Sequence, residues 1–552
     1  MRRFLAACSP HMIPSIQDQK LPQVFLTVVL TVILGIAAYV RLLGLGAESF
    51  WLDEGYSLAY TELPFRKMIA YIATRDVHPP LYYILFKIWR NTGDSEMWLR
   101  LPSTVFGIAA VAYMWSMVDE HWGASAAAAS SLLLATSEMA IWYSQEARMY
   151  SLLLLLSVLS IKYFLRFITP FQFPGDGAQN NAFPRATAMD CLGLAFFTLT
   201  LLYTHNVAVF LWGTQLLVGG MTGVLPFIRS RRSRTGCDIG NPVFRNSVFR
   251  QWLLCQAVIG AVYLPWVHVL FGQSANVLSR FWIEPPNMDS VWNAFRIPLV
   301  WGSWNDNIIW DVTKIIVLIV AVKTVVNFRD VKGMILGMFV ILPVLMSYLY
   351  SVFRSPILLE RSLIFMIVPL LALIGSFLTI PGAGASFFKK SVGVLQVAVG
   401  VLLFAFLVHM NLAPWRIELD VQSKEDFRTA ATNALRFADG STAVVFNNSA
   451  TQAAFDYYFH RSVEVRSVDE HGVPCHYLEV PEGNANLEPL VTRESIAELD
   501  RKLSARQRVV LVRSYHKLSD PSGLLKGYFD SNWRFDRDLS AKGVEMLLYT
   551  RR

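Results

Sequence analysis

Glu48–Ser57 (ESFWLDEGYS) opens a polar segment that separates two long apolar stretches of the chain. The same segment contains His78–Tyr83 (HPPLYY) and closes with Arg100–Pro102 (RLP). Acids, a histidine and an arginine thus occur together, beside aromatic residues that favour the lipid–water boundary. Ionisable groups next to a membrane are costly to maintain, so we expect this segment to carry the chemistry of the protein.

The composition indicates a membrane protein. Of the 552 residues, 54% are hydrophobic and 16% are charged, whereas charged residues make up about a quarter of an ordinary soluble domain. The net charge of +8 comes from basic loops that set membrane orientation, so no nucleic-acid partner is predicted. The five cysteines include no CxxC pair, and neither a disulfide framework nor a zinc site is indicated.

Apolar runs long enough to cross a bilayer, about 20 residues each, recur along the chain. The first, at about 21–43, has no cleavage site after it, so we interpret it as a retained anchor behind a cytoplasmic tail at residues 1–21. Ten more follow at about 99–118, 122–142, 149–168, 190–205, 207–228, 251–271, 308–327, 333–353, 361–380 and 391–411. The pattern predicts a polytopic α-helical membrane protein with about 11 transmembrane helices, and at most about 13.

The distribution of basic residues orients these helices. Positive charge is concentrated in Arg229–Arg250 and at Lys389 and Lys390, which the positive-inside rule places in the cytoplasm. Alternation then puts the first loop, at residues 45–98, on the outer side. The turns at 144–148 and 203–205 and the segments 272–307 and 354–361 follow it there. We therefore expect most ionisable residues near the membrane to meet on one outer face.

Residues 412–552 differ in composition from the transmembrane part at 22–411, because charged residues return and no run could span a bilayer. Short, branched apolar runs at Ala443–Phe446, Val509–Val512 and Met546–Tyr549 predict buried strands. The stretches at about 424–437 and 451–459 predict helices. We expect a small C-terminal α/β extracytoplasmic domain.

Asp53 and Glu54 are the candidate catalytic residues. They follow Phe50–Leu52, whose side chains suit the lipid–water boundary, and a carboxylate that is partly desolvated there becomes more basic. Adjacent side chains point in different directions on a helix or a strand. We therefore predict that Asp53 is a general base and that Glu54 has an orienting role; the alternative is a solvated pair of loop acids.

His78 is a candidate ligand for a phosphate group. It precedes Pro79, which holds the histidine backbone extended and so fixes the direction of its side chain. A hydrogen-bonding or cationic group at the outer boundary suits a phosphate, although an interfacial histidine beside a helix start is an alternative. Asp76 is expected to pair with His78 or to help hold a metal, and whether a divalent cation takes part stays open.

Arg100, Arg148 and Arg361 each stand at the outer end of a predicted span. Any one of them alone is explained by a side chain that reaches from the helix end to the interface. If they converge with His78, they form an anion site, because guanidinium groups bind phosphate oxygens through two parallel hydrogen bonds. Glu146 is placed to tether Arg148, with a surface ion pair as the alternative.

Several short motifs occur in an order that resembles the bacterial branch of the GT-C glycosyltransferases. This branch is related to the protein O-mannosyltransferases and the lipid A aminoarabinose transferase, and is glycosyltransferase family 39-like. The motifs are Trp51–Glu54, His78–Tyr83, Arg100–Ser103, Ser144–Tyr150, Tyr203–His205, Phe281–Ile283 with Pro285 and Pro286, and Arg361 with Pro369.

The resemblance implies a fold of GT-C type and the transfer of a sugar from a polyprenyl-phosphate carrier to an acceptor hydroxyl on the outer face of the membrane. It matches Asp53 to the catalytic aspartate of the family, and His78 to a position where some members carry a lysine that contacts the donor phosphate. Tyr56 stands where the aminoarabinose enzymes carry an arginine, which counts against lipid A as acceptor and aminoarabinose as donor. The implied partners are a polyprenyl-phosphate-linked sugar, a lipid, glycan or protein acceptor, and membrane lipid.

The chemistry of the residues agrees with a single, inverting displacement, because a lipid phosphate leaves readily and needs one base and several cations rather than a second acid. The predicted site comprises Asp53 and Glu54 as catalytic residues, His78, Arg148 and Arg361 as ligands of the donor phosphate, and Tyr56, Asp76, Tyr82, Arg100, Glu146 and His205 as positioning residues. The expected location is the bacterial inner membrane, with the C-terminal domain on the periplasmic or extracellular side. A transporter or flippase of lipid-linked sugars is the alternative, but it would place charges at mid-bilayer and show paired repeats.

Overall fold

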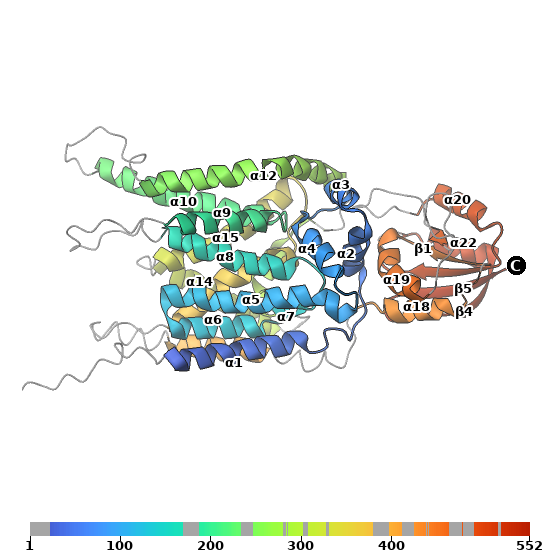
Figure 1. Ribbon diagram of the computed structural model, residues 1–552, viewed down its shortest axis with the longest axis horizontal. Helices are drawn as coiled ribbons and strands as arrows, with labels where there is room; N and C mark the ends of the chain where they lie inside the picture. Colours follow the sequence, from blue (N-terminus) through green and yellow to red (C-terminus); the bar gives the residue numbers. More distant parts are fainter. Residues whose placement is uncertain are drawn as a thin grey trace, which may run out of the picture.

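The protein has three parts along its long axis (Figure 1): a bundle of long helices, a group of three short helices, and an α/β domain at the C-terminal end. The structure is a computed structural model. It describes residues 23–168, 187–232, 247–279, 283, 285–301, 307–326, 331–378, 397–410, 424–437, 439, 441–462, 477–478, 491–516 and 520–552. The predicted tail at 1–21, the basic residues Lys389 and Lys390, and much of Arg229–Arg250 lie outside the described residues.

The bundle contains the apolar helices and the short, more polar helix α13. They are α1 (Gln23–Leu42), α5 (Glu96–Trp122), α6 (Ala124–Thr136), α7 (Glu138–Ser144), α8 (Tyr150–Ile168), α9 (Ala188–Leu202), α10 (Ala208–Arg232), α12 (Ser247–Ser279), α13 (Met288–Arg296), α14 (Asn307–Val326), α15 (Val331–Phe353), the 3-10 helix η2 (Glu360–Met366), α16 (Ile367–Gly375), the 3-10 helix η3 (Ser376–Leu378), and a short helix at Val397–Met410. Among the described residues, six helices are long and apolar enough to cross a membrane, or seven if α6 and α7 form one broken span. Each predicted span coincides with one helix or with consecutive helices, while the number that cross stays a prediction.

One predicted span, at about 122–142, is broken in the structure. Helices α6 and α7 meet at an angle of 57°, and Ser137 between them caps α7 by accepting a hydrogen bond from the backbone of Ala140. The carbonyls at the end of α6 are satisfied by buried Arg41 of α1, which donates to the oxygens of Leu134 and Ala135. The bend directs α7 toward the turn at 145–149 that carries Glu146 and Arg148.

The predicted first outer loop, 45–98, contains three helices: α2 (Leu52–Glu62), α3 (Phe65–Arg75) and α4 (Leu81–Arg90). The reason is apolar residues at helical spacing, because Met68 with Ile72 and Tyr82 with Phe86 are each buried on one face. Prolines stand immediately before α3 and α4, where their fixed backbone angle favours a helix start. These helices lie between the bundle and the α/β domain (Figure 1).

The C-terminal domain has a five-stranded sheet of order β2-β1-β3-β5-β4. Its elements are α18 (Phe427–Leu435), β1 (Thr442–Phe446), α19 (Ser449–Ser462), β2 (Tyr477–Leu478), α20 (Arg493–Leu503), β3 (Arg508–Arg513), α22 (Leu524–Asn532), β4 (Trp533–Asp538) and β5 (Glu545–Arg551). Strands β1, β2 and β3 are parallel, and β5 is antiparallel to β3 and β4. The three predicted strands and both predicted helices are confirmed.

Helices cover both faces of the sheet, which explains why β1 and β3 have continuous apolar sequences. Val444 and Val510 pack with α18 and α19 on one face. Val445 and Leu511 pack with α20 and α22 on the other. Strand β4 was missed because all of its residues after Trp533 are exposed, so its sequence has no apolar run.

Candidate active site

The first turn of α2 directs Asp53 and Glu54 to different partners, as predicted for neighbouring residues. Asp53 Oδ2 accepts a hydrogen bond from Arg361 Nη1 of η2 over 3.0 Å. Glu54 faces Arg100 of α5. Of the two acids, Asp53 is the one that solvent reaches, because 13% of its side chain is exposed and none of Glu54 is.

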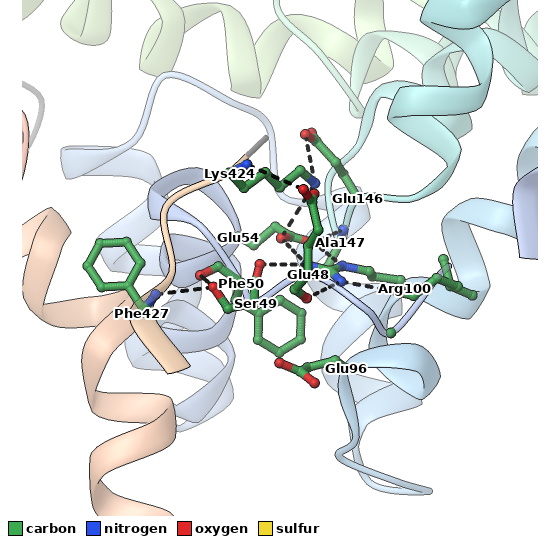
Figure 2. Close-up of polar contacts among 12 residues, drawn as sticks. Glu48, Ser49, Phe50, Glu54, Glu96, Arg100, Glu146, Ala147, Lys424 and Phe427 are labelled. Carbon is green, nitrogen blue, oxygen red and sulfur yellow. Dashed lines mark hydrogen bonds and ion pairs between the residues drawn. The ribbon is translucent and has the colours of Figure 1, made fainter. Parts of the chain in front are cut away.

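Glu54 forms a buried ion pair with Arg100 (Figure 2). Its Oε1 accepts from Arg100 Nε and from the backbone of Ala147, each over 2.8 Å, and its Oε2 accepts from Arg100 Nη2 over 2.7 Å. Burial raises the pKa of Glu54, but Arg100 and then Lys424 outweigh it, so the pKa lies below its usual value. Glu54 is therefore a fixed anion and a poor proton acceptor.

Arg100 uses all five of its N–H donors inside the protein. Besides Glu54, its Nη1 donates to the carbonyls of Leu45 and Glu48, and its Nη2 donates to the carbonyl of Ser49. No donor is left for a phosphate, so Arg100 takes no part in an anion site with the other arginines. Its contacts hold the chain before α2, as expected of a positioning residue.

Arg148 lies in the turn between α7 and α8 and contacts Asp53. Its Nη1 donates to the Asp53 carbonyl over 3.1 Å and to the Tyr83 hydroxyl over 3.3 Å. Its Nε is buried and has no hydrogen-bond partner among the described residues. The Arg148 carbonyl accepts from Ser103 Oγ over 3.1 Å, and the Tyr82 hydroxyl lies 3.3 Å from Ser103 Oγ. Tyr82 thus supports the backbone of Arg148.

Two histidines stand beside these groups, with ring centres 4.9 Å apart. His78 Nδ1 donates to Asp76 Oδ1 over 2.9 Å, which confirms the predicted pairing of these two residues. Burial raises the pKa of Asp76, but His78 outweighs it and the pKa lies below its usual value. The carboxylate therefore holds the histidine ring in one orientation.

His205 is buried and neutral. Burial lowers its pKa well below the usual value, and the neighbouring His78, Arg148 and Arg361 lower it further. Its Nδ1 accepts from the backbone of Val207 over 3.2 Å, so the proton of the neutral ring is on Nε2. Within the described part of the chain, Nε2 has no hydrogen-bond partner. His205 is thus an available neutral donor.

Four of the segments that were predicted to lie on the outer side therefore meet. Asp53 of the first segment contacts both Arg148 and Arg361, and His78 contacts His205. Tyr56 is placed differently, because its ring packs on Tyr60 at 5.7 Å, within an aromatic cluster.

Glu146 does not tether Arg148 in the described contacts. Its Oε1 lies 3.2 Å from Lys424 Nζ, which is also 3.9 Å from Glu54 Oε2 (Figure 2). Sequence reasoning missed Lys424, because the polar run Lys424–Asp426 resembles an ordinary solvated surface. Burial raises the pKa of Glu146 above its usual value; Lys424 opposes this, and Glu54 adds to it.

A metal site is not supported by the residues that the structure describes. They contain no group of three or more His, Cys, Asp or Glu side chains placed to hold an ion. Asp76 and His78 bind each other instead. The participation of a divalent cation stays a prediction, and the described contacts identify no protein ligands for it.

Comparison with family models and with curated protein sequences finds no match. Among solved structures, the chain is similar to ArnT from Cupriavidus metallidurans in the apo state, with a TM-score of 0.54 and 12% identity over 95% of this chain and 98% of that chain. The same protein bound to undecaprenyl phosphate gives a TM-score of 0.52 and 11% identity over 94% and 97%. The apo oligosaccharyltransferase of Archaeoglobus fulgidus gives 0.51 and 10% over 88% and 69%.

Likenesses at 10 to 12% identity show the fold and leave the activity to the residues of the site. They extend over nearly the whole chain, from the apolar helices to the α/β domain, so the predicted architecture of a polytopic helical protein with a C-terminal α/β part is confirmed. The fold of the chain is therefore similar to the folds of ArnT and of the archaeal oligosaccharyltransferase.

Proposed function

We propose that the protein is an integral-membrane glycosyltransferase that moves a sugar from a polyprenyl-phosphate carrier to an acceptor hydroxyl at the outer face of the bacterial inner membrane. The observation that carries the proposal is the placement of Asp53. Its carboxylate is partly exposed and accepts a hydrogen bond from Arg361, and its backbone carbonyl accepts one from Arg148. The site thus combines one accessible base with cations suited to a departing phosphate.

The donor phosphate is assigned to Arg148, Arg361, His78 and His205. Arg148 Nε and His205 Nε2 are buried donors without a hydrogen-bond partner among the described residues, and a buried donor left unpaired is costly. Phosphate oxygens would satisfy both donors. In support, ArnT has been crystallised with undecaprenyl phosphate, and AglB from Archaeoglobus fulgidus, with a TM-score of 0.50, forms a complex with dolichol-phosphate.

In the proposed reaction, Asp53 accepts the proton of the acceptor hydroxyl as that oxygen bonds to the anomeric carbon. The bond from this carbon to the phosphate oxygen breaks on the opposite side, so the configuration inverts. The electron pair leaves with the phosphate, where Arg148, Arg361 and the two histidines stabilise the charge. The carrier's tail, held among the apolar helices, fixes the geometry of the displacement.

The orientation of the chain is part of this proposal. The tail at 1–21 lies in the cytoplasm, and the domain at 412–552 lies on the periplasmic or extracellular side. Support comes from the contact of α19 with α2, because this contact places the α/β domain at the same end of the bundle as Asp53 (Figure 1).

The test uses the purified full chain in lipid nanodiscs. Mass spectrometry of co-purified lipid identifies the carrier-linked sugar, and that lipid is then supplied with candidate acceptors while undecaprenyl phosphate release is measured. Asp53→Asn should abolish release without changing the melting temperature. The control is Glu62→Gln, an exposed acid at the other end of α2 that pairs with Arg90, which should release phosphate normally. Retained release in Asp53→Asn would overturn the base assignment. Passage of the intact lipid-linked sugar across vesicles, without cleavage, would identify a flippase instead.

A further inference from the structure

Lys424 comes from the segment that leads into the α/β domain, and this segment is fastened to the chain just before α2. Ser49 Oγ donates to the Glu425 carbonyl over 2.7 Å, and the Phe427 backbone donates to Ser49 Oγ over 3.1 Å. The Lys424 backbone donates to Glu48 Oε1 over 3.4 Å. The position of Lys424 relative to α2 is therefore set by backbone contacts (Figure 2).

The Lys424 side chain is buried between two carboxylates, with 6% of it exposed. Its ammonium group lies 3.2 Å from Glu146 and 3.9 Å from Glu54, and 5.2 Å from the ring centre of Trp142. Because the N–H groups of Arg100 all donate to Glu54 and to backbone carbonyls, Lys424 is the cation available to Glu146. No other hydrogen-bond donor reaches the Glu146 carboxylate among the described residues.

The two acids beside Lys424 belong to the two segments that form the site. Glu54 follows Asp53 in α2, and Glu146 is two residues before Arg148 in the turn after α7. The segments already touch, because Glu54 accepts from the Ala147 backbone and Arg148 donates to the Asp53 carbonyl. Without Lys424, Glu146 would be buried beside Glu54 with no cation of its own, and the repulsion between the two carboxylates would push these segments apart.

We propose that Lys424 is a positioning residue of the active site: it compensates Glu146 beside Glu54 and so holds Arg148 against Asp53. The proposal rests on the proposed function for its activity readout. It follows that docking of the C-terminal domain completes the site, because the lysine comes from the segment that joins α18.

Other contacts at the same place show that the whole domain is docked there. The Tyr458 hydroxyl of α19 accepts from the Phe50 backbone over 2.6 Å. Arg428 of α18 pairs with Glu96 of α5 over 2.6 Å. Helix α19 also approaches Gly55 closely, because a Cβ atom there would lie 2.6 Å from the Ala454 backbone nitrogen. Lys424 is thus one part of a larger interface between the α/β domain and the rest of the chain.

The test compares Lys424→Met with the double variant Lys424→Met, Glu146→Gln. The single change should lower transfer about tenfold or more at pH 8, and activity should recover as the pH falls, because Glu146 takes up a proton and no longer needs a cation. The double variant should transfer within about threefold of the wild type at pH 8. The charged groups that act on Glu146 are Lys424, Glu54 and Asp53. The titratable hydroxyls near it are those of Tyr82, Tyr143 and Tyr150.

A second readout does not depend on activity. Infrared spectroscopy at neutral pH should show the band of a protonated buried carboxyl in Lys424→Met and not in the double variant. Lys526→Met is the matched control, since that lysine is exposed on α22 and pairs with Asp530; it should match the wild type in both measurements.

The outcomes separate the two proposals. If the wild type transfers no sugar from any carrier, the proposed function fails, and the infrared band still tests Lys424. If the wild type transfers sugar but the double variant stays as inactive as Lys424→Met, with the same loss at every pH and no carboxyl band, compensation of Glu146 is disproved.

Discussion

Arg361 donates to Asp53 across 308 residues of sequence and joins the 3-10 helix η2 to the first turn of α2. The pair is only partly buried, with 23% of the arginine side chain and 13% of the aspartate side chain exposed. Glu54, one residue further along, is paired inside the protein and fully buried. The difference in access, rather than the presence of acids, separates the base candidate from its neighbour.

The first prediction concerns Arg361. Arg361→Ala should weaken binding of undecaprenyl phosphate about tenfold or more, because a charge-assisted hydrogen bond to the phosphate is lost. Arg361→Lys should lose less affinity for undecaprenyl phosphate, since lysine keeps the positive charge but lacks the planar pair of donors. Binding is measured by tryptophan fluorescence in nanodiscs. Arg537→Ala, in the exposed strand β4, is the control, and equal affinity in all four proteins would assign Arg361 to structure alone.

The second prediction concerns the buried pair of Glu54 and Arg100. Glu54→Gln should destabilise the protein by about 3 kcal/mol or more, because Arg100 is then left buried without its counter-charge. The double variant Glu54→Gln, Arg100→Met should lose less unfolding free energy than the sum of the losses in the two single variants, since neither charge remains. Denaturant titration in detergent provides the measurement. Additive losses would show that the pair does not act as a unit.

The third prediction concerns the pH dependence of that same stabilisation. The pKa of Glu54 is lower in the folded protein than its usual value of about 4.3, so its contribution is complete above that value and is lost as the pH falls through the folded-state pKa. The wild type and Glu54→Gln should therefore differ most above about pH 5 and converge in stronger acid. A constant difference down to pH 3 would contradict this assignment.

Sequence alone singled out Asp53 as a candidate base, because an acid that follows interfacial aromatic residues is a local pattern. It also predicted the helical bundle and the central strands of the α/β domain, since those depend on runs of apolar residues. It failed at Lys424, whose backbone bonds to Glu48 across 376 residues. That lysine acquires its role only when the α/β domain docks. In the sequence, its neighbours Glu425 and Asp426 make the segment resemble an exposed surface.

Arg100 was predicted as a positioning residue, but its partners could not be predicted, for a related reason. A sequence shows that an arginine stands at a helix end, but not that carbonyls of Leu45, Glu48 and Ser49 consume its donors. By contrast, the helices α3 and α4 were within reach of sequence reasoning. Met68 with Ile72, and Tyr82 with Phe86, have the spacing of one helix face, and each helix follows a proline.

The fourth prediction tests docking without changing any charge. Gly55→Ala places a methyl group 2.6 Å from the backbone nitrogen of Ala454, which α19 can relieve only by moving away from α2. We expect faster cleavage by protease between the bundle and the α/β domain, and a loss of transfer that follows the undocking. Gly527→Ala in α22 is the control, because its added methyl group meets nothing within 4 Å and should leave docking unchanged. If Gly55→Ala resists protease like the wild type yet loses transfer, the glycine acts on the first turn of α2 and not through the interface.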